Sequence, residues 1–197
     1  MRICLLRHGE TDWNNLEKLQ GREDVPLNAK GIEQAKEAAQ YLKKNNWRVI
    51  ITSPLLRAKV SAGIISEAIG NIEIREEAAF VERDYGRASG MTPAERKAAF
   101  NNDEESVMEP FEILQDRTVQ ALFKYIQEYD GSDIIIVSHG LALNAILAYL
   151  TKNKIGGEKI KRINFKNASM TLLEKTDDKI EVIYFNKTAG ELSEKIF

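Results

Sequence analysis

Short apolar runs alternate with longer helical patterns over the first 150 residues of the chain. The runs at 2–6, 47–52 and 133–138 are continuously apolar at their centres, which predicts strands buried on both faces. Residues 72–75 alternate apolar and charged positions, which predicts an edge or half-exposed strand. The polar stretch from Arg7 to Val25 is long for a loop, and loops of that length are usually functional or partly structured.

Helices are predicted between these strands by apolar periodicity and by residues that favour helix starts. Asn28 is a candidate N-cap, and Thr92 followed by Pro93 and Glu95 matches a capping box. The predicted helices begin near Asn28, Pro54, Thr92, Phe111 and Leu141 and end near Leu42, Ile69, Phe100, Tyr129 and Leu150. The positions expected to face the core are Ile32, Ala35, Ala38, Ala39 and Leu42 in the first helix, and Leu114, Leu122 and Ile126 in the fourth.

The last third of the chain has a different pattern. Strands are predicted near 161–165, 169–175 and 180–185, with turns at 156–157 and 176–178. Strands separated by helices over the first 150 residues imply right-handed crossovers, so the final hairpin would add an antiparallel edge to a mainly parallel sheet. We therefore expect an α/β fold, a three-layer α/β/α sandwich, built as a single domain over 1–197.

Composition narrows the class of protein. A net charge of -2 over 197 residues argues against a partner bound by neutralising many phosphates, so no nucleic acid is expected. The lone Cys4 lies in the first apolar run, which leaves no intramolecular disulfide and favours a reducing compartment. No apolar stretch reaches the length of a membrane span, and the first is too short for a signal peptide. We expect a cytoplasmic protein with no membrane partner.

The chain has only two histidines, and both follow an apolar strand and precede a glycine. His8 stands in Arg7-His8-Gly9, and His139 stands in Ser138-His139-Gly140. If the two strands are parallel neighbours, both histidines open on one sheet edge, where open α/β folds bind ligands. Arg57, in the first turn after another strand, would add a second arginine, and the helix after Gly140 would add backbone amides. Such a pocket suits a dianionic phosphoryl group.

Two other kinds of site are disfavoured. Glu10 and Asp12 could join the histidines as metal ligands, but neighbouring arginines repel a divalent cation and no chelating histidine spacing occurs, so no metal is expected. Neither a Walker-type phosphate loop nor a dinucleotide-binding glycine fingerprint is present. Side chains would therefore hold the phosphate.

The motifs together resemble the histidine phosphatase (phosphoglycerate mutase-like) superfamily, in its phosphatase-type branch. The similarity covers residues 2 to about 150, and the motifs occur in the order typical of the family. They are Arg7-His8-Gly9-Glu10-Thr11, Trp13-Asn14, Gln20-Gly21, Leu27 to Gln34, Ser53 to Ala58, Glu82-Arg83-Asp84-Tyr85-Gly86 and Ser138-His139-Gly140.

The resemblance implies a role for each matching residue. His8 matches the nucleophile that forms a phosphohistidine, and Glu82 matches the acid that protonates the leaving oxygen and then activates water. Glu10, Glu76, Glu77 and Asp84 are rival carboxylates for the role of Glu82. The residues matching phosphate- or substrate-binding positions are Arg7, Asn14, Gln20, Gly21, Arg57, Tyr85, His139, Gly140 and Leu141, with Arg7 and His139 also catalytic.

Three functions remain open from the sequence. The leading one is a phosphatase acting on a small phosphorylated metabolite without a cofactor. A phosphoglycerate mutase dependent on 2,3-bisphosphoglycerate is the alternative, disfavoured because the segment 90–117 is short and lacks the adjacent arginine pair of the family's mutases. A catalytically silent phospholigand-binding domain is the third. Phe111-Glu112-Ile113 replaces a Gly-Glu-Ser common in the phosphatase branch, which is consistent with a more apolar substrate. Exposed strands would allow a monomer or a homodimer.

Overall fold

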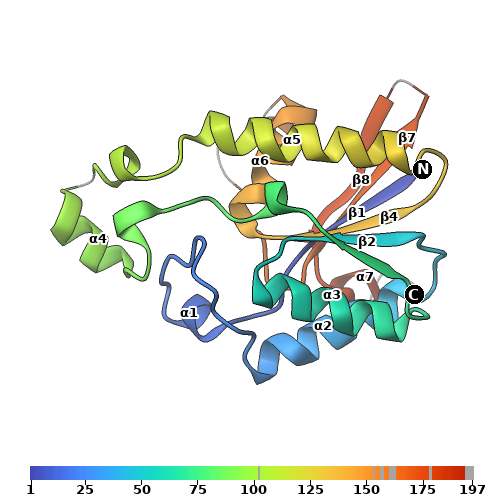
Figure 1. The fold of residues 1–197 in the computed structure, drawn as a ribbon, viewed down its shortest axis with the longest axis horizontal. Helices are drawn as coiled ribbons and strands as arrows, with labels where there is room; N and C mark the ends of the chain where they lie inside the picture. The colour runs from blue at the N-terminus through green and yellow to red at the C-terminus, as the bar shows by residue number, and fades with distance from the viewer. Residues whose placement is uncertain (102, 153, 156–157, 160–162, 178, 194–197) are drawn as a thin grey trace.

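A six-stranded sheet forms the centre of the protein (Figure 1). The computed structural model describes residues 1–101, 103–152, 154–155, 158–159, 163–177 and 179–193. The strands of this sheet are β1 (Arg2–Arg7), β2 (Val49–Thr52), β3 (Glu73–Glu76), β4 (Ile134–Ser138), β7 (Met170–Thr176) and β8 (Lys179–Lys187). A separate two-stranded sheet pairs β5 (Lys154–Ile155) with β6 (Glu158–Lys159).

The order of the strands confirms the predicted α/β class. Across the large sheet the order is β3-β2-β4-β1-β7-β8, and each pair among the first four strands is parallel. β7 runs antiparallel to β1, and β8 antiparallel to β7. The sheet is therefore mainly parallel with an antiparallel edge, as the alternating strand and helix patterns predict.

Helices cover both faces of the sheet (Figure 1). The helices α2, α3 and α7 lie on one face, and α5 and α6 lie on the other. This three-layer arrangement confirms the predicted sandwich. The bounds are α2 (Ala29–Leu42), α3 (Leu56–Ala68), α5 (Phe111–Glu128), α6 (Gly140–Thr151) and α7 (Ala189–Ser193).

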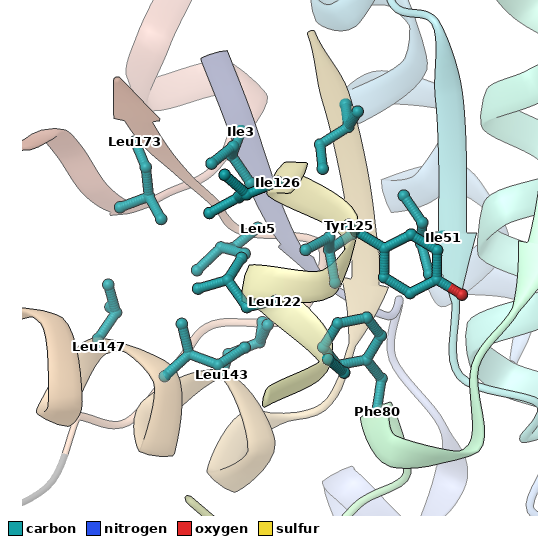
Figure 2. Packing of buried hydrophobic residues seen from close by; sticks show 14 of the residues in the cluster. Ile3, Leu5, Ile51, Phe80, Leu122, Tyr125, Ile126, Leu143, Leu147 and Leu173 are labelled. Carbon is teal, nitrogen blue, oxygen red and sulfur yellow. The ribbon is translucent and has the colours of Figure 1, made fainter. Parts of the chain in front are cut away.

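Side chains of β1 alternate between two hydrophobic clusters. Ile3 and Leu5 pack with α5 and α6, where Leu122 lies beside them (Figure 2), whereas Cys4 and Leu6 pack with α2 and α3. Each of these strand residues is fully buried. The strand is apolar at consecutive positions because successive side chains point to opposite, equally covered faces.

Several short elements extend beyond the carboxyl ends of the parallel strands (Figure 1). The start of α4 (Pro93–Phe100) confirms the predicted capping box, since the Glu95 amide donates to Thr92 Oγ1 (3.4 Å) and the Thr92 amide donates to Glu95 Oε2 (2.7 Å). The sequence patterns did not predict the short helix inside the loop from Arg7 to Val25. The short elements beyond the strand ends are α1 (Asp12–Asn15), η1 (Ala78–Phe80), η2 (Gly86–Ala88), α4 (Pro93–Phe100) and η3 (Glu104–Val107).

The strand predicted near 161–165 is wrong for residues 163–165, which form no strand. Ile163 and Phe165 are buried, so their apolar character reflects packing in the core. The Phe165 carbonyl accepts a hydrogen bond from Arg7 Nη1, and the Ile163 amide donates to Asn144 Oδ1 (3.2 Å). Backbone groups that bond to side chains in this way do not build a strand ladder. Residues 160–162, with the turn predicted at 156–157 and position 178, lie outside the described residues.

The segment after β1 packs backbone to backbone against the start of α2. A Cβ placed on Gly31 would lie 2.1 Å from the Glu10 carbonyl oxygen and 2.6 Å from the Glu10 nitrogen. Asn28 Oδ1 accepts from the Gly31 amide (2.8 Å), which confirms the predicted N-cap. Gln34 Oε1 accepts from the Glu10 amide (2.9 Å). The first turns of α2 therefore fix the backbone that follows β1.

Replacing Gly31 with alanine should destabilise the fold. The new methyl group has no room beside the Glu10 backbone, and overpacking of this kind costs about 1–3 kcal/mol. Gly63→Ala in α3 is the matched control, because its Cβ would meet nothing within 4 Å and alanine favours a helix by about 0.5–1 kcal/mol. Urea denaturation of both variants measures the difference, and equal free energies of unfolding would contradict the expectation.

Candidate active site

The ends of β1 and β4 bring the two histidines together. Arg7 and Ser138 are partners in the parallel register, and the His8 amide donates to the Ser138 carbonyl (3.0 Å). The centroids of the His8 and His139 rings lie 5.2 Å apart, with the rings tilted by 57°. Only 2% of His8 and 0% of His139 is exposed. The adjacency expected from two parallel strand ends is thus present.

Geometry and charge set the protonation state of His8. Nδ1 lies 2.6 Å from the Gly9 carbonyl oxygen, which can only accept, so Nδ1 carries the hydrogen. Burial, followed by the charges of Arg57 and Arg7, lowers the pKa of His8 well below its usual value. The ring is therefore neutral near pH 7. A neutral ring with its hydrogen on Nδ1 keeps a lone pair on Nε2, the form required of a nucleophile.

His139 has the features of a hydrogen-bond donor to an anion. Its Nε2 lies 2.8 Å from Ser53 Oγ, and Ser53 Oγ accepts from the Leu55 amide (3.3 Å). If the Ser53 hydroxyl donates to Nε2, the hydrogen of the neutral ring is on Nδ1. Nδ1 is buried and has no hydrogen-bond partner in the described protein. Burial, with Arg57 as the next cause, lowers the pKa of His139 well below its usual value.

Two arginines flank the histidines, with Arg57 buried and Arg7 partly buried. Arg57, in the first turn of α3, donates to the carbonyls of Glu23 (2.7 Å) and Gly21 (2.8 Å), and Arg7 donates to a carbonyl through Nη1. Burial lowers the pKa of Arg57 to about 10 and also lowers that of Arg7, but Arg57 still stays charged at neutral pH. The Nε atoms of both arginines have no partner in the described protein. Because buried polar groups are normally paired, these donors suit the oxygens of a bound anion.

Glu82 lies at the N-terminus of α6. Its carboxylate accepts from the amides of Leu141 (3.1 Å) and Ala142 (3.1 Å), and also from Arg83 (2.9 Å). A Cβ on Gly140 would lie 3.8 Å from both Glu82 Oε2 and Arg7 Nε, so the carboxylate and the guanidinium both lie close to this glycine, and both line the same pocket. The Leu141 amide, which the family resemblance assigns to phosphate, therefore holds Glu82 in this structure. Helix N-termini favour such negative groups.

A pocket of about 300 Å³ opens beside Arg7 and Glu82. Two of its lining residues, Arg7 and Gly140, are adjacent in the chain to His8 and His139. Half of the lining residues are apolar or aromatic, so the pocket combines charged groups with an apolar wall. The lining residues are Arg7, Glu82, Tyr85, Gly140, Leu141, Ile163, Asn164 and Phe165.

The remaining predicted binding residues are Asn14, which lies in α1, and Gln20 and Gly21, which follow it. Asn14 Oδ1 accepts from the amide and hydroxyl of Thr11 and from Asn167 Nδ2 (3.0 Å), which fixes the direction of the Asn14 amide group. Gly21 has a φ of 52°, and a Cβ there would lie 2.9 Å from the Tyr85 ring. Gln20 is buried, and its Oε1 has no partner in the described protein. None of these three residues lines the pocket beside Glu82.

The four carboxylates that the sequence left as rivals to Glu82 are engaged elsewhere. None of them lines the pocket. Their partners are Lys30 and Asn28 for Glu10, Lys59 for Glu76, Lys124 and Tyr125 for Glu77, and Arg22 with the Gly86 amide for Asp84. Glu82 is the carboxylate that the structure places beside Arg7.

Sequence reasoning missed residues outside the pocket that bind the backbone of Glu82 and His8. Arg117 of α5 donates to the Glu82 carbonyl (3.0 Å), and Glu109 binds the Arg117 guanidinium. Asn167 links Asn14 to the backbone of His8. A signal for Arg117 was available, because it stands three residues after the buried Leu114 and thus on the inward side of an amphipathic helix.

Two kinds of feature are not found among the residues that the structure describes. No group of three or more histidine, cysteine, aspartate or glutamate side chains is arranged to hold a metal ion. No helix in this part of the chain combines the length and apolar character that crossing a bilayer requires.

Known proteins match the chain over almost its whole length. The family model described as histidine phosphatase superfamily (branch 1) matches residues 3–188. An uncharacterised phosphatase, PhoE of Bacillus subtilis, is 40% identical over 93% of each chain. A probable phosphoglycerate mutase, GpmB of Serratia proteamaculans, is 31% identical over 88% of this chain and 85% of its own. A phosphoserine phosphatase from Entamoeba histolytica, solved in complex with 3-phosphoglyceric acid, is 27% identical with a TM-score of 0.80, covering 95% of this chain and 97% of its own.

Stability should fall as the pH drops below about 6.5. Both histidines are neutral when folded, whereas unfolding returns each pKa to about 6.5, so below that value only the unfolded chain takes up these protons. Each such proton lowers the free energy of unfolding by up to about 1.4 kcal/mol per pH unit. The carboxylates whose pKa values are lowered by folding, such as Glu10 and Glu109, also reduce the free energy of unfolding in acid, but only below about pH 4.5.

Urea denaturation at about pH 7.5 and pH 5.5 measures this effect. We expect a lower free energy of unfolding at the acidic value. His139→Gln should show a weaker pH dependence than the native chain, because glutamine does not titrate. Equal stability of the native chain at both pH values would contradict the neutral, buried state of the histidines.

Proposed function

The chain belongs to the histidine phosphatase superfamily, branch 1, and from that premise we propose that it is a phosphomonoester phosphatase working through a phosphohistidine on His8. The observation that carries the proposal is the state of His8. A neutral ring whose Nδ1 hydrogen is bonded to Gly9 O keeps a lone pair on Nε2, and the positive charges of Arg7 and Arg57 act on the same ring. This is the arrangement expected of a nucleophile that attacks an anion bound by arginines.

In the proposed first step, a bond forms between His8 Nε2 and the phosphorus while the bond to the leaving oxygen breaks. Protonated Glu82 gives its proton to that oxygen, so an alcohol departs and the carboxylate remains. Arg7, Arg57 and His139 Nδ1 would bind the phosphoryl oxygens, whose charge they stabilise most in the transition state.

In the proposed second step, water replaces histidine on phosphorus. Glu82 takes a proton from the water, the oxygen attacks, and the bond between phosphorus and Nε2 breaks. Inorganic phosphate leaves, and His8 returns to its neutral form. The two steps use only the substrate, water and this chain's own side chains, so the proposal includes no cofactor.

The proposed substrate is a small phosphorylated metabolite. The Entamoeba histolytica relative, a phosphoserine phosphatase, binds 3-phosphoglyceric acid, which supports this class. The pocket wall of Tyr85, Leu141, Ile163 and Phe165 supports a substrate with an apolar part next to its phosphate. The mutase named among the relatives keeps phosphoryl transfer between carbons of a phosphoglycerate as the second candidate.

Replacing His8 with alanine should abolish hydrolysis. Loss of a nucleophile removes the covalent route, so we expect p-nitrophenyl phosphate turnover to fall by roughly 10³-fold or more. The native protein, quenched during turnover, should carry phosphate that is stable to base and released by acid, and the variant should carry none. Lys36→Ala, at an exposed ion pair, serves as the control with native turnover.

Two results of that experiment would count against the proposal. Undiminished turnover in His8→Ala would remove His8 from the nucleophile role. A native protein that binds phosphate but neither hydrolyses the ester nor becomes phosphorylated would support the silent phospholigand-binding alternative.

A separate assay distinguishes a phosphatase from a mutase. With 3-phosphoglycerate as substrate, we expect inorganic phosphate to be released faster than 2-phosphoglycerate appears, because water competes for the phosphohistidine. Addition of 2,3-bisphosphoglycerate should not reverse this order. Phosphorus NMR or coupled assays measure both products, and faster interconversion than phosphate release would favour the mutase.

A further inference from the structure

The segment that carries Glu82 has little regular structure of its own. Between η1 and η2, residues 81–85 belong to neither a helix nor a strand. Two backbone carbonyls of this segment and one of η1 nevertheless bind the Arg117 side chain from α5. Arg117 Nη1 donates to Ala79 O (2.6 Å) and Val81 O (2.8 Å), and Nη2 donates to Glu82 O (3.0 Å).

Glu109 holds the other edge of the same guanidinium. Arg117 Nε donates to Glu109 Oε1 (2.8 Å), and Nη2 also donates to Glu109 Oε2 (2.9 Å). All five N–H groups of the guanidinium are thereby used, two on the carboxylate and three on carbonyls. Lysine has a single ammonium group, so it cannot reproduce this fork.

Glu109 also fixes the chain on the far side of Glu82. Its Oε2 accepts from the Asp84 amide (3.1 Å), its own amide donates to Asp84 O (2.8 Å), and Arg83 Nε donates to its carbonyl (2.6 Å). Burial alone would raise the pKa of Glu109, but its hydrogen bonds with Arg117 and the Asp84 amide outweigh that effect and lower the pKa. Residues on both sides of Glu82 are therefore bound to one charged pair.

We propose that Arg117, oriented by Glu109, is a positioning residue that holds the Glu82 carboxyl where it can transfer a proton. The inference rests on the proposed role of Glu82 as general acid and base. Arg117 does not line the pocket, and its side chain is 18% exposed against 8% for Glu109. It acts by fixing the backbone from which the Glu82 side chain projects. Displacement of a catalytic group by about 1 Å can cost about 10²-fold in rate.

A positioning role for the acid depends on the leaving group, whereas a purely structural role does not. p-Nitrophenolate is a weak base and departs with little help from an acid. Phenolate is a stronger base and needs the proton more. Phenyl phosphate and p-nitrophenyl phosphate share the same phosphoryl group and nearly the same shape. The ratio of their kcat/KM values thus measures proton transfer, since kcat/KM includes only the steps through release of the phenol.

The experiment compares the two substrates in R117K, R117M and E109Q. We expect kcat/KM for phenyl phosphate to fall by roughly 10- to 100-fold and that for p-nitrophenyl phosphate by less than about 3-fold, because general acids typically contribute about 10²–10⁴-fold. R117K keeps the charge and much of the volume, so it guards against loss of folding. Glu82→Gln is the reference for complete loss of the acid and should show the largest change in the ratio.

Arg2→Met is the matched control. Arg2 also forms a network, donating to Asp133 and Asn45, but it lies at the start of β1, away from the Glu82 segment. Its loss should lower stability without changing the substrate ratio.

The outcomes separate this inference from the proposed function. A changed ratio in Glu82→Gln but not in the Arg117 variants would overturn the positioning role and leave Glu82 as the acid. An equal loss on both substrates in R117K and R117M would also overturn it, as a structural effect. An unchanged ratio in Glu82→Gln itself would instead overturn the assignment of Glu82.

Discussion

The positive charge of Arg7 and Arg57 beside two buried histidines is the constraint on which the candidate site depends. Arg57 is almost fully buried and Arg7 is partly buried, and burial of the two histidines, followed by the charges of these arginines, keeps His8 and His139 neutral. Carbonyl oxygens satisfy only part of each guanidinium, because both Nε atoms have no partner in the described protein. An anion bound here would complete these hydrogen bonds and offset the positive charge in a region of low dielectric.

The sheet makes this concentration of charge possible. β1, β2 and β4 are parallel neighbours, so their carboxyl ends place His8, Ser53 and His139 along one edge. Apolar side chains on both faces of these strands anchor them in two clusters, so the site is built on rigid elements. The N-terminus of α6 then adds backbone amides, which hold the Glu82 carboxylate in the pocket that Arg7 also lines.

Much of this organisation was predictable from local patterns. The continuous apolar runs predicted β1 and β4, and the capping box from Thr92 to Glu95 predicted the start of α4. The two strand-histidine-glycine stretches predicted a shared site, and the rings lie 5.2 Å apart. The prediction was wrong for 163–165, where apolar residues serve the core and the backbone bonds to side chains. Local patterns report burial, but they do not report what a backbone group pairs with.

The sequence by itself determined the fold class through strand periodicity and the family through its motifs at strand ends, because both are local features of the chain. Only the tertiary structure decided which nitrogen of His8 carries its hydrogen and which carboxylate shares a pocket with Arg7. It also decided that Arg117 and Glu109 support the Glu82 segment. These properties depend on distances between atoms of segments far apart in the sequence, and folding alone sets those distances.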